Sequence, residues 1–103
     1  MEIVWTDTAK EDMELIYQFH SKFNAAYAAR LYNRILDETL ILKSFPSIAP
    51  VEFKLLPENE TIRALTVASG RFKVLYIAHN NKISITGVWD CRRNPKYLKK
   101  RLG

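Results

Sequence analysis

The first half of the chain carries apolar residues at the spacing of amphipathic helices. A strand-like run, EIVW at residues 2–5, precedes TDTAKED, which predicts the start of a helix. Thr8 and Glu11 have the spacing of a capping box, and the acidic residues of this segment suit the positive end of a helix dipole. One face of the predicted helix then carries Ala9, Met13, Ile16, Tyr17 and His20.

A second helix is predicted from about Ala25 to Lys43, with Asn24 as its N-cap. Its apolar stripe consists of Ala28, Leu31, Ile35 and Leu42, with Tyr32 and Leu36 beside them. Pro46 and Pro50 cannot continue a helix, so the element ends before SFPSIAP. Because the link between the two helices is short, we expect an antiparallel helical hairpin.

The hydrophobic period changes after Pro50. Four runs have the composition of strands: VEFKLL, TIRALTVA, FKVLYIAH and KISITGVWD. The links between them are short, and Asn80-Asn81 fits a two-residue hairpin because Asn tolerates positive φ. These features predict an antiparallel meander.

Both alternating sets of the run at 72–79 are largely apolar. Phe72, Val74 and Tyr76 form one set, and Leu75 and Ile77 belong to the other. Such a strand is expected to be central and covered on both faces. The helical hairpin can cover one face, and the other needs the C-terminal segment or a second protein.

The expected architecture is therefore a single α+β domain over residues 1–103. An N-terminal strand and an α-helical hairpin pack on one face of a small antiparallel sheet, and a basic C-terminal tail follows.

Charge is divided unevenly along the chain. Residues 1–45 hold five Lys or Arg and seven Asp or Glu, which gives a net charge of −2. Residues 46–103 hold eleven Lys or Arg and four Asp or Glu, which gives a net charge of +7. This asymmetry favours a polyanion or an acidic partner at the second half. The alternative is a solvated basic face that binds nothing anionic.

Several classes of protein lack support in the sequence. No apolar run approaches the roughly 20 residues of a membrane span, and no signal peptide is recognisable, so we expect a cytoplasmic protein without membrane contact. The single cysteine, Cys91, excludes an internal disulfide. There is no Gly-rich phosphate loop and no metal-ligand spacing, so no cofactor or metal is expected.

His20 and His79 are interpreted as structural or surface residues. Arg92 could lower the pKa of Cys91, but no group is placed to make that thiol catalytic.

Cations within the strands and after them are the remaining candidates for chemistry. Arg63 alternates with apolar residues in one run and Lys73 in the next. Arg92 and Arg93 follow the last strand, and Tyr97 comes soon after. If the tail folds back over the sheet, these five groups converge. They would then suit RNA cleavage by the 2′-hydroxyl, in which cations stabilise the phosphate and a phenol moves protons. Further RNA contacts are predicted for Arg71, Lys96, Lys99, Lys100 and Arg101. The alternative is that all these cations lie at the rim of the sheet, where their aliphatic stems cover apolar surface and their charged ends stay in water.

The order and spacing of four segments resemble the RelE/ParE superfamily of bacterial type II toxins. These segments are TDTAKEDMELIY, LILKSFP, IRALTVASGRFKVLYIA and ITGVWDCRRNPKYL, and the likeness covers nearly the whole chain. RelE-like members cleave mRNA in the ribosomal A site with basic residues and often a C-terminal tyrosine. ParE-like members instead poison DNA gyrase and lack that apparatus.

The resemblance implies site residues by position. Arg63 lies where RelE-like enzymes keep a basic residue, Arg92 or Arg93 matches the arginine after the last strand, and Tyr97 resembles the C-terminal tyrosine. Lys73 departs from the arginine common at its position. The long helical hairpin followed by FPSIAP is more typical of ParE-like chains.

The resemblance also implies a partner, a cognate antitoxin whose acidic, extended segment covers the open sheet face. Operator DNA would be bound only through that antitoxin. Three readings stay open: ribosome-dependent mRNA cleavage, which the sequence favours, gyrase inhibition, and an inactive toxin that only binds its antitoxin.

Overall fold

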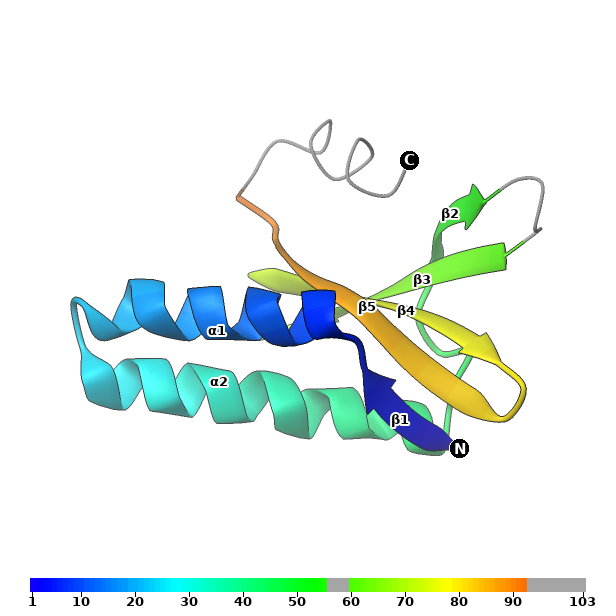
Figure 1. The fold of residues 1–103 in the computed structure, drawn as a ribbon, viewed down its shortest axis with the longest axis horizontal. Coiled ribbons are helices and arrows are strands. Elements are labelled where there is room, and N and C mark those ends of the chain that lie inside the picture. Colours follow the sequence, from blue (N-terminus) through cyan, green and yellow to red (C-terminus); the bar gives the residue numbers. More distant parts are fainter. Residues whose placement is uncertain (56–59, 93–103) are drawn as a thin grey trace.

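The computed structural model describes residues 1–55 and 60–92, and every predicted helix and strand is present within them, although the second helix ends at Thr39 and its last predicted turn, Leu40–Lys43, is 3₁₀ (Figure 1). In chain order they are β1 (Glu2–Trp5), α1 (Asp7–Ser21), α2 (Ala25–Thr39), the 3₁₀ turn η1 (Leu40–Lys43), β2 (Val51–Leu55), β3 (Glu60–Val67), β4 (Phe72–His79) and β5 (Lys82–Asp90). Among the described residues no helix is long and apolar enough to cross a membrane.

The sequence predicted the N-cap of α2 correctly and the N-cap of α1 incorrectly. Asn24 caps α2 as expected, since its side-chain oxygen accepts the Tyr27 N–H at 2.9 Å. The N-cap of α1 is Thr6 and not Thr8, because Thr6 keeps an extended backbone and its Oγ1 accepts the Ala9 N–H at 3.2 Å. Thr8 already lies in the first turn, where its backbone is helical and cannot cap.

Five strands form one sheet in the order β1-β5-β4-β3-β2. Strands β2 to β5 are antiparallel neighbours, as predicted, whereas β1 pairs in parallel with β5. The predicted meander is thus confirmed, and the N-terminal strand joins the edge of the sheet and does not pack on its face. The helices and three strands separate β1 from β5, and a connection of that length allows parallel pairing. Asn80 and Asn81 form the predicted tight turn, with φ of 50° and 63°.

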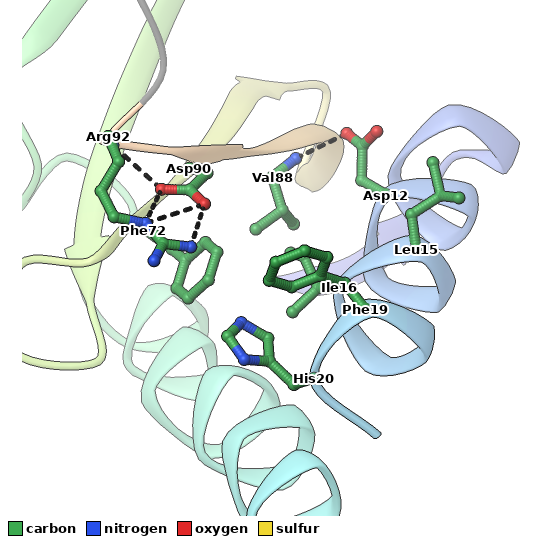
Figure 2. Close-up of a pocket in the computed structure, with 9 residues that line it drawn as sticks. All are labelled: Asp12, Leu15, Ile16, Phe19, His20, Phe72, Val88, Asp90 and Arg92. Carbon is green, nitrogen blue, oxygen red and sulfur yellow. Dashed lines mark hydrogen bonds and ion pairs between the residues drawn. The ribbon is translucent and has the colours of Figure 1, made fainter. Parts of the chain in front are cut away.

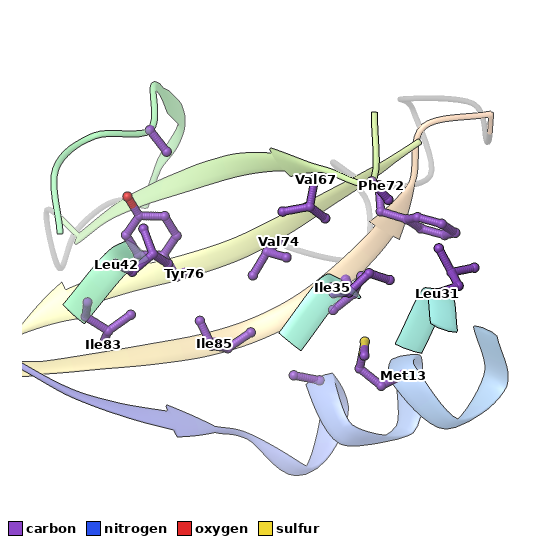
Figure 3. Packing of buried hydrophobic residues seen from close by; sticks show 14 residues of the cluster. Met13, Leu31, Ile35, Leu42, Val67, Phe72, Val74, Tyr76, Ile83 and Ile85 are labelled. Carbon is purple, nitrogen blue, oxygen red and sulfur yellow. The ribbon is translucent and has the colours of Figure 1, made fainter. Parts of the chain in front are cut away.

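The main core lies between the helical hairpin and one face of the sheet (Figures 1 and 3). Both helices run side by side across this face, in opposite directions. The helix stripes and the strand side chains interlock there, and full burial of one such aliphatic side chain contributes about 1.5–3 kcal/mol. The large side chains of this core are Met13, Leu31, Ile35, Leu42, Val67, Phe72, Val74, Tyr76, Ile83 and Ile85.

The opposite face of the sheet carries a second, smaller cluster. Ile62, Ala64, Leu75 and Trp89 form it and are only 1–3% exposed. β4 is thus central and buried on both faces, as predicted. The sequence analysis expected this face to be covered by the C-terminal segment or by a second protein, and these four side chains are buried in the structure of the single chain.

Candidate functional site

Arg63 lies on the helix-covered face of the sheet. It pairs across the strands with Tyr76, a member of the main core. Its Nη1 donates to the carbonyl of Ala49 at 2.7 Å and more weakly to that of Ser47 at 3.4 Å. The Tyr76 hydroxyl donates to the Pro46 carbonyl at 2.8 Å. Arg63 and Tyr76 therefore hold the segment that precedes β2 against the sheet.

Lys73 lies on the opposite face. It pairs with Trp89, which belongs to the second cluster, and its Nζ donates to Glu52 Oε1 at 2.9 Å. Since Arg63 points to the helices and Lys73 away from them, these two cations do not converge as expected. Each cation lies near apolar residues, and a hydrogen bond to its own acceptor offsets the partial desolvation of its charge.

Arg92 forms a fork with a carboxylate of the last strand. Its Nη2 is 2.7 Å from Asp90 Oδ2, its Nε lies 3.1 Å from Oδ1, and its backbone N–H donates to Oδ1 at 2.9 Å (Figure 2). Hydrogen bonding to Arg92 holds the pKa of Asp90 below its ordinary value. The Arg92 charge is thus matched locally, on the helix side of the sheet and away from Lys73.

The other predicted site residues are distributed as follows. Arg71 directly precedes β4 and donates a hydrogen bond to the Tyr27 hydroxyl. The predicted catalytic residues Arg93 and Tyr97 lie outside the described residues, as do the predicted RNA contacts Lys96, Lys99, Lys100 and Arg101.

A groove of about 300 Å³ lies between α1 and the end of β5 (Figure 2). β1 covers the edge of β5 only as far as Ile85, and α1 lies beside the strand beyond that point. Asp12 joins helix to strand there, since its Oδ2 accepts the Val88 N–H at 2.9 Å. The groove is lined by Asp12, Leu15, Ile16, Phe19, His20, Phe72, Val88, Asp90 and Arg92.

His20 forms part of the floor of this groove, on the buried face of α1 where the sequence placed it. Its ring makes edge contacts with Phe19 and Tyr27, at centroid distances of 5.1 Å and 5.6 Å. Burial lowers the pKa of His20, and the cations of Arg71 and Arg92 lower it further. The imidazole is therefore neutral at pH 7, which suits an apolar groove better than an acid catalyst.

Large apolar side chains stand exposed along the rim of the groove. Leu15 and Phe19 line the groove from α1, and Phe23 follows four residues later, after the helix has ended at Ser21, with its ring 5.7 Å from that of Phe19; the three side chains are 62%, 51% and 78% exposed. The sequence interpretation followed the buried face of α1 and missed this second stripe, although the spacing alone could have revealed it. Exposed patches of this kind mark surfaces that bind proteins or other apolar ligands.

The remaining reactive group among the described residues is a single thiol, that of Cys91. Cys91 is exposed, but partial desolvation raises the pKa of its thiol, and the carboxylates of Asp90 and Glu52 raise it further, against the opposing charge of Lys73. The suggested lowering by its neighbour Arg92 is therefore wrong. Within residues 1–55 and 60–92, no group of His, Cys, Asp and Glu side chains has the arrangement of a metal site.

Comparison with known proteins gives a likeness in structure. No protein-family model matches the chain, and no curated protein matches its sequence. A chain in the solved structure "Chromosomal ParDE TA system from P. aeruginosa" superposes with a TM-score of 0.73 and is 19% identical. The match covers 87% of this chain and 95% of that chain. The α+β fold expected from the RelE/ParE resemblance is thus confirmed, and this chain shares its fold with a chain of a ParDE toxin–antitoxin system.

Proposed function

We propose that this chain is the toxin of a type II toxin–antitoxin system. The observation that carries this proposal is the shared fold, which extends over nearly the full length of both the present chain and the ParDE chain. The sequence segments that resemble RelE/ParE toxins support the same function.

The groove beside α1 is the proposed docking site for an amphipathic segment of the antitoxin. Half-covering a phenylalanine removes on the order of 100 Å² from water, which stabilises a complex by about 2–3 kcal/mol. Phe19 and Phe23 alone therefore offer enough apolar area for a specific contact. Arg92 lies at the strand end of the groove, but Asp90 already matches its charge, so the exposed apolar side chains carry the proposed contact. The sheet face opposite the helices, which the resemblance implies as the antitoxin contact, stays a prediction beside this groove.

DNA gyrase is the proposed target. Phosphate cleavage without a metal needs cations around one phosphate group. In the structure Arg63 holds a loop, Lys73 pairs with Glu52 on the other face, and Arg92 pairs with Asp90. This separation favours a toxin that acts by binding a protein, in line with the ParE-like helical hairpin.

Ribosome-dependent mRNA cleavage is the second candidate function. It is favoured by the net charge of +7 in residues 46–103, which suits a surface of ribosomal RNA. Primer extension on ribosomes that carry a defined mRNA tests this function. New A-site cuts that Arg92→Ala or Tyr97→Phe abolishes would establish it, and intact mRNA beside an active control toxin would exclude it.

Growth arrest and its neutralisation test the proposed function itself. Induction of the chain in bacteria should stop growth, and co-expression of the protein encoded next to it should restore growth. Phe19→Ser should keep the arrest and lose the neutralisation. Phe45→Ser is the matched control, because Phe45 is 59% exposed but lies in the turn after η1, outside the groove. A chain that never slows growth would contradict the toxin function, and equal neutralisation of both variants would contradict the docking site.

A further inference from the structure

A second pocket, of about 440 Å³, lies between α2 and the turn that joins β3 to β4. Tyr27, Arg30 and Arg34 reach it from α2, where a spacing of three and four residues places them on one helix face. Ser69 and Arg71 reach it from the turn. None of these residues lines the proposed antitoxin groove, although Tyr27 and Arg71 lie near its residue His20, so the pocket needs its own explanation.

Two arginines in this pocket each donate a hydrogen bond to a hydroxyl group. Arg34 Nη2 donates to Ser69 Oγ at 2.9 Å, and Arg71 donates to the Tyr27 hydroxyl. Each hydroxyl oxygen is thus used as an acceptor, and neither donates a hydrogen bond to any described residue. Their O–H protons are therefore available for a further acceptor, and the bound guanidinium makes each a stronger donor.

Arg71 is held in place before any ligand arrives. Its guanidinium carbon lies 5.7 Å from the ring centroid of Tyr27 and 5.9 Å from that of Phe72. Stacking against aromatic rings fixes the planar fork of arginine, so little side-chain entropy is lost when an anion binds.

The pocket carries an excess of positive charge. Arg30, Arg34 and Arg71 line it, and one carboxylate lies beside them, that of Glu38, which is 3.2 Å from Arg34 Nε and also accepts the Ala68 N–H at 2.9 Å. The formal charge of these four side chains is +2. Arg30 is exposed and makes no hydrogen bond or ion pair with a described residue. Its charge is available to a ligand.

The turn beside the pocket has an unusual backbone. Ala68, Ser69 and Gly70 have φ values of 53°, 55° and 86°, so two residues with a Cβ occupy the left-handed region in succession. This conformation is unfavourable for alanine, which lacks a side chain able to compensate. The contacts from Glu38 to Ala68 and from Arg34 to Ser69 hold it. Strain of this kind is found where a conformation serves a site.

We propose that this pocket binds a phosphodiester group of a nucleic acid backbone. The oxygens of a phosphate can accept from three guanidinium forks and two hydroxyls together, whereas a carboxylate is satisfied by one fork. The choice of nucleic acid rests on the proposed function, since gyrase acts on DNA and the ribosome contains RNA.

Fluorescence anisotropy with short labelled single strands tests the site on the full chain, without any target present. RNA and DNA of the same base sequence serve as probes, and a preference between them identifies the source of the phosphate. Arg71→Gln should weaken binding by about tenfold, and the more exposed Arg30→Gln by about threefold. The plot of log K against log salt should become shallower by about 0.7 for each arginine that no longer neutralises a phosphate.

Lys10→Gln is the matched control, because it removes one exposed charge from α1 at the far side of the hairpin. A chain that binds neither strand overturns the proposal, as does equal weakening by Lys10→Gln and Arg30→Gln, since binding would then reflect net charge alone. Poly-glutamate that displaces RNA and depends on the same two arginines would also overturn it, because the pocket would then select carboxylates. Arg30→Gln keeps the test valid if Arg71→Gln fails to fold. A chain that arrests growth but does not bind nucleic acid overturns the pocket and leaves the toxin function standing.

Discussion

Substitution of Arg63 by alanine separates a structural role from a catalytic one. The sequence places Arg63 in a set of catalytic cations, whereas in the structure its guanidinium holds the carbonyls of Ala49 and Ser47. A catalytic residue can be removed at little cost to stability. A residue that fastens a loop to the sheet cannot.

The expected magnitude follows from the contact to Ala49. This charge-assisted bond is 2.7 Å long, and Ala49 is only 3% exposed, so its carbonyl has little access to water after truncation. Loss of a hydrogen bond to a charged group costs about 1.5–3 kcal/mol. The contact to Ser47 at 3.4 Å adds little. Because 1 kcal/mol shifts the Tm of a domain of this size by about 4–8 °C, a loss of about 2 kcal/mol should lower Tm by about 8–16 °C.

Thermal unfolding followed by circular dichroism measures this change. Arg30→Ala is the matched control, since it truncates an exposed arginine and should change stability by less than about 0.5 kcal/mol. Arg63→Lys keeps a cationic donor, and because both contacts come from the single atom Nη1, it should retain part of the Tm that Arg63→Ala loses. If Arg63→Ala melted within about 4 °C of the wild type and yet lost toxicity, the loop-holding role would be refuted and the catalytic one supported.

The remaining predictions concern single side chains. The pKa of His20 is lowered in the folded state from 6.5, so the unfolded chain takes up this proton first. Stability should therefore fall as the pH drops from about 7 to about 5.5, and His20→Gln should reduce that fall in urea titrations, whereas an unchanged profile would contradict the shift. Asn24→Ala should cost about 1 kcal/mol through loss of the α2 cap, while Asn33→Ala in the exposed middle of the helix should cost nothing by the same melts. A double-mutant cycle on Lys73 and Glu52, whose side chains are 32% and 25% exposed, should give a coupling of about 0.5–1 kcal/mol, and a coupling of zero would show the pair to be incidental.

The elements of this fold were predictable because each has a strong local signal. The helical stripes, the shift to strand composition after Pro50 and the Asn80-Asn81 turn require no knowledge of tertiary structure. The local sequence allowed two choices for the N-cap of α1. Thr6 and Thr8 are both good caps, and the spacing to Glu11 favours Thr8, but β1 runs as far as Trp5 and fixes the helix start at Thr6.

The arrangement of the candidate site depends on strand register, which local patterns do not fix. Alternation shows that Arg63 and Lys73 each share a face with apolar neighbours, but not whether the two faces are the same. The turn after β3 decides this, by pairing Thr66 with Lys73 and Arg63 with Tyr76. Its backbone includes an alanine at positive φ, which turn preferences do not predict. A difference of one residue in that turn would have reversed the face of every side chain in β4.

The supercoiling activity of purified DNA gyrase tests the central claim most directly. Relaxed plasmid is incubated with gyrase, ATP and increasing amounts of the purified chain, with the antitoxin-bound chain as control. We expect the free chain to block supercoiling in a dose-dependent way and the antitoxin to restore it. Full supercoiling at every dose, with A-site cuts in mRNA by the same preparation, would contradict the account and identify the chain as a ribosome-dependent ribonuclease.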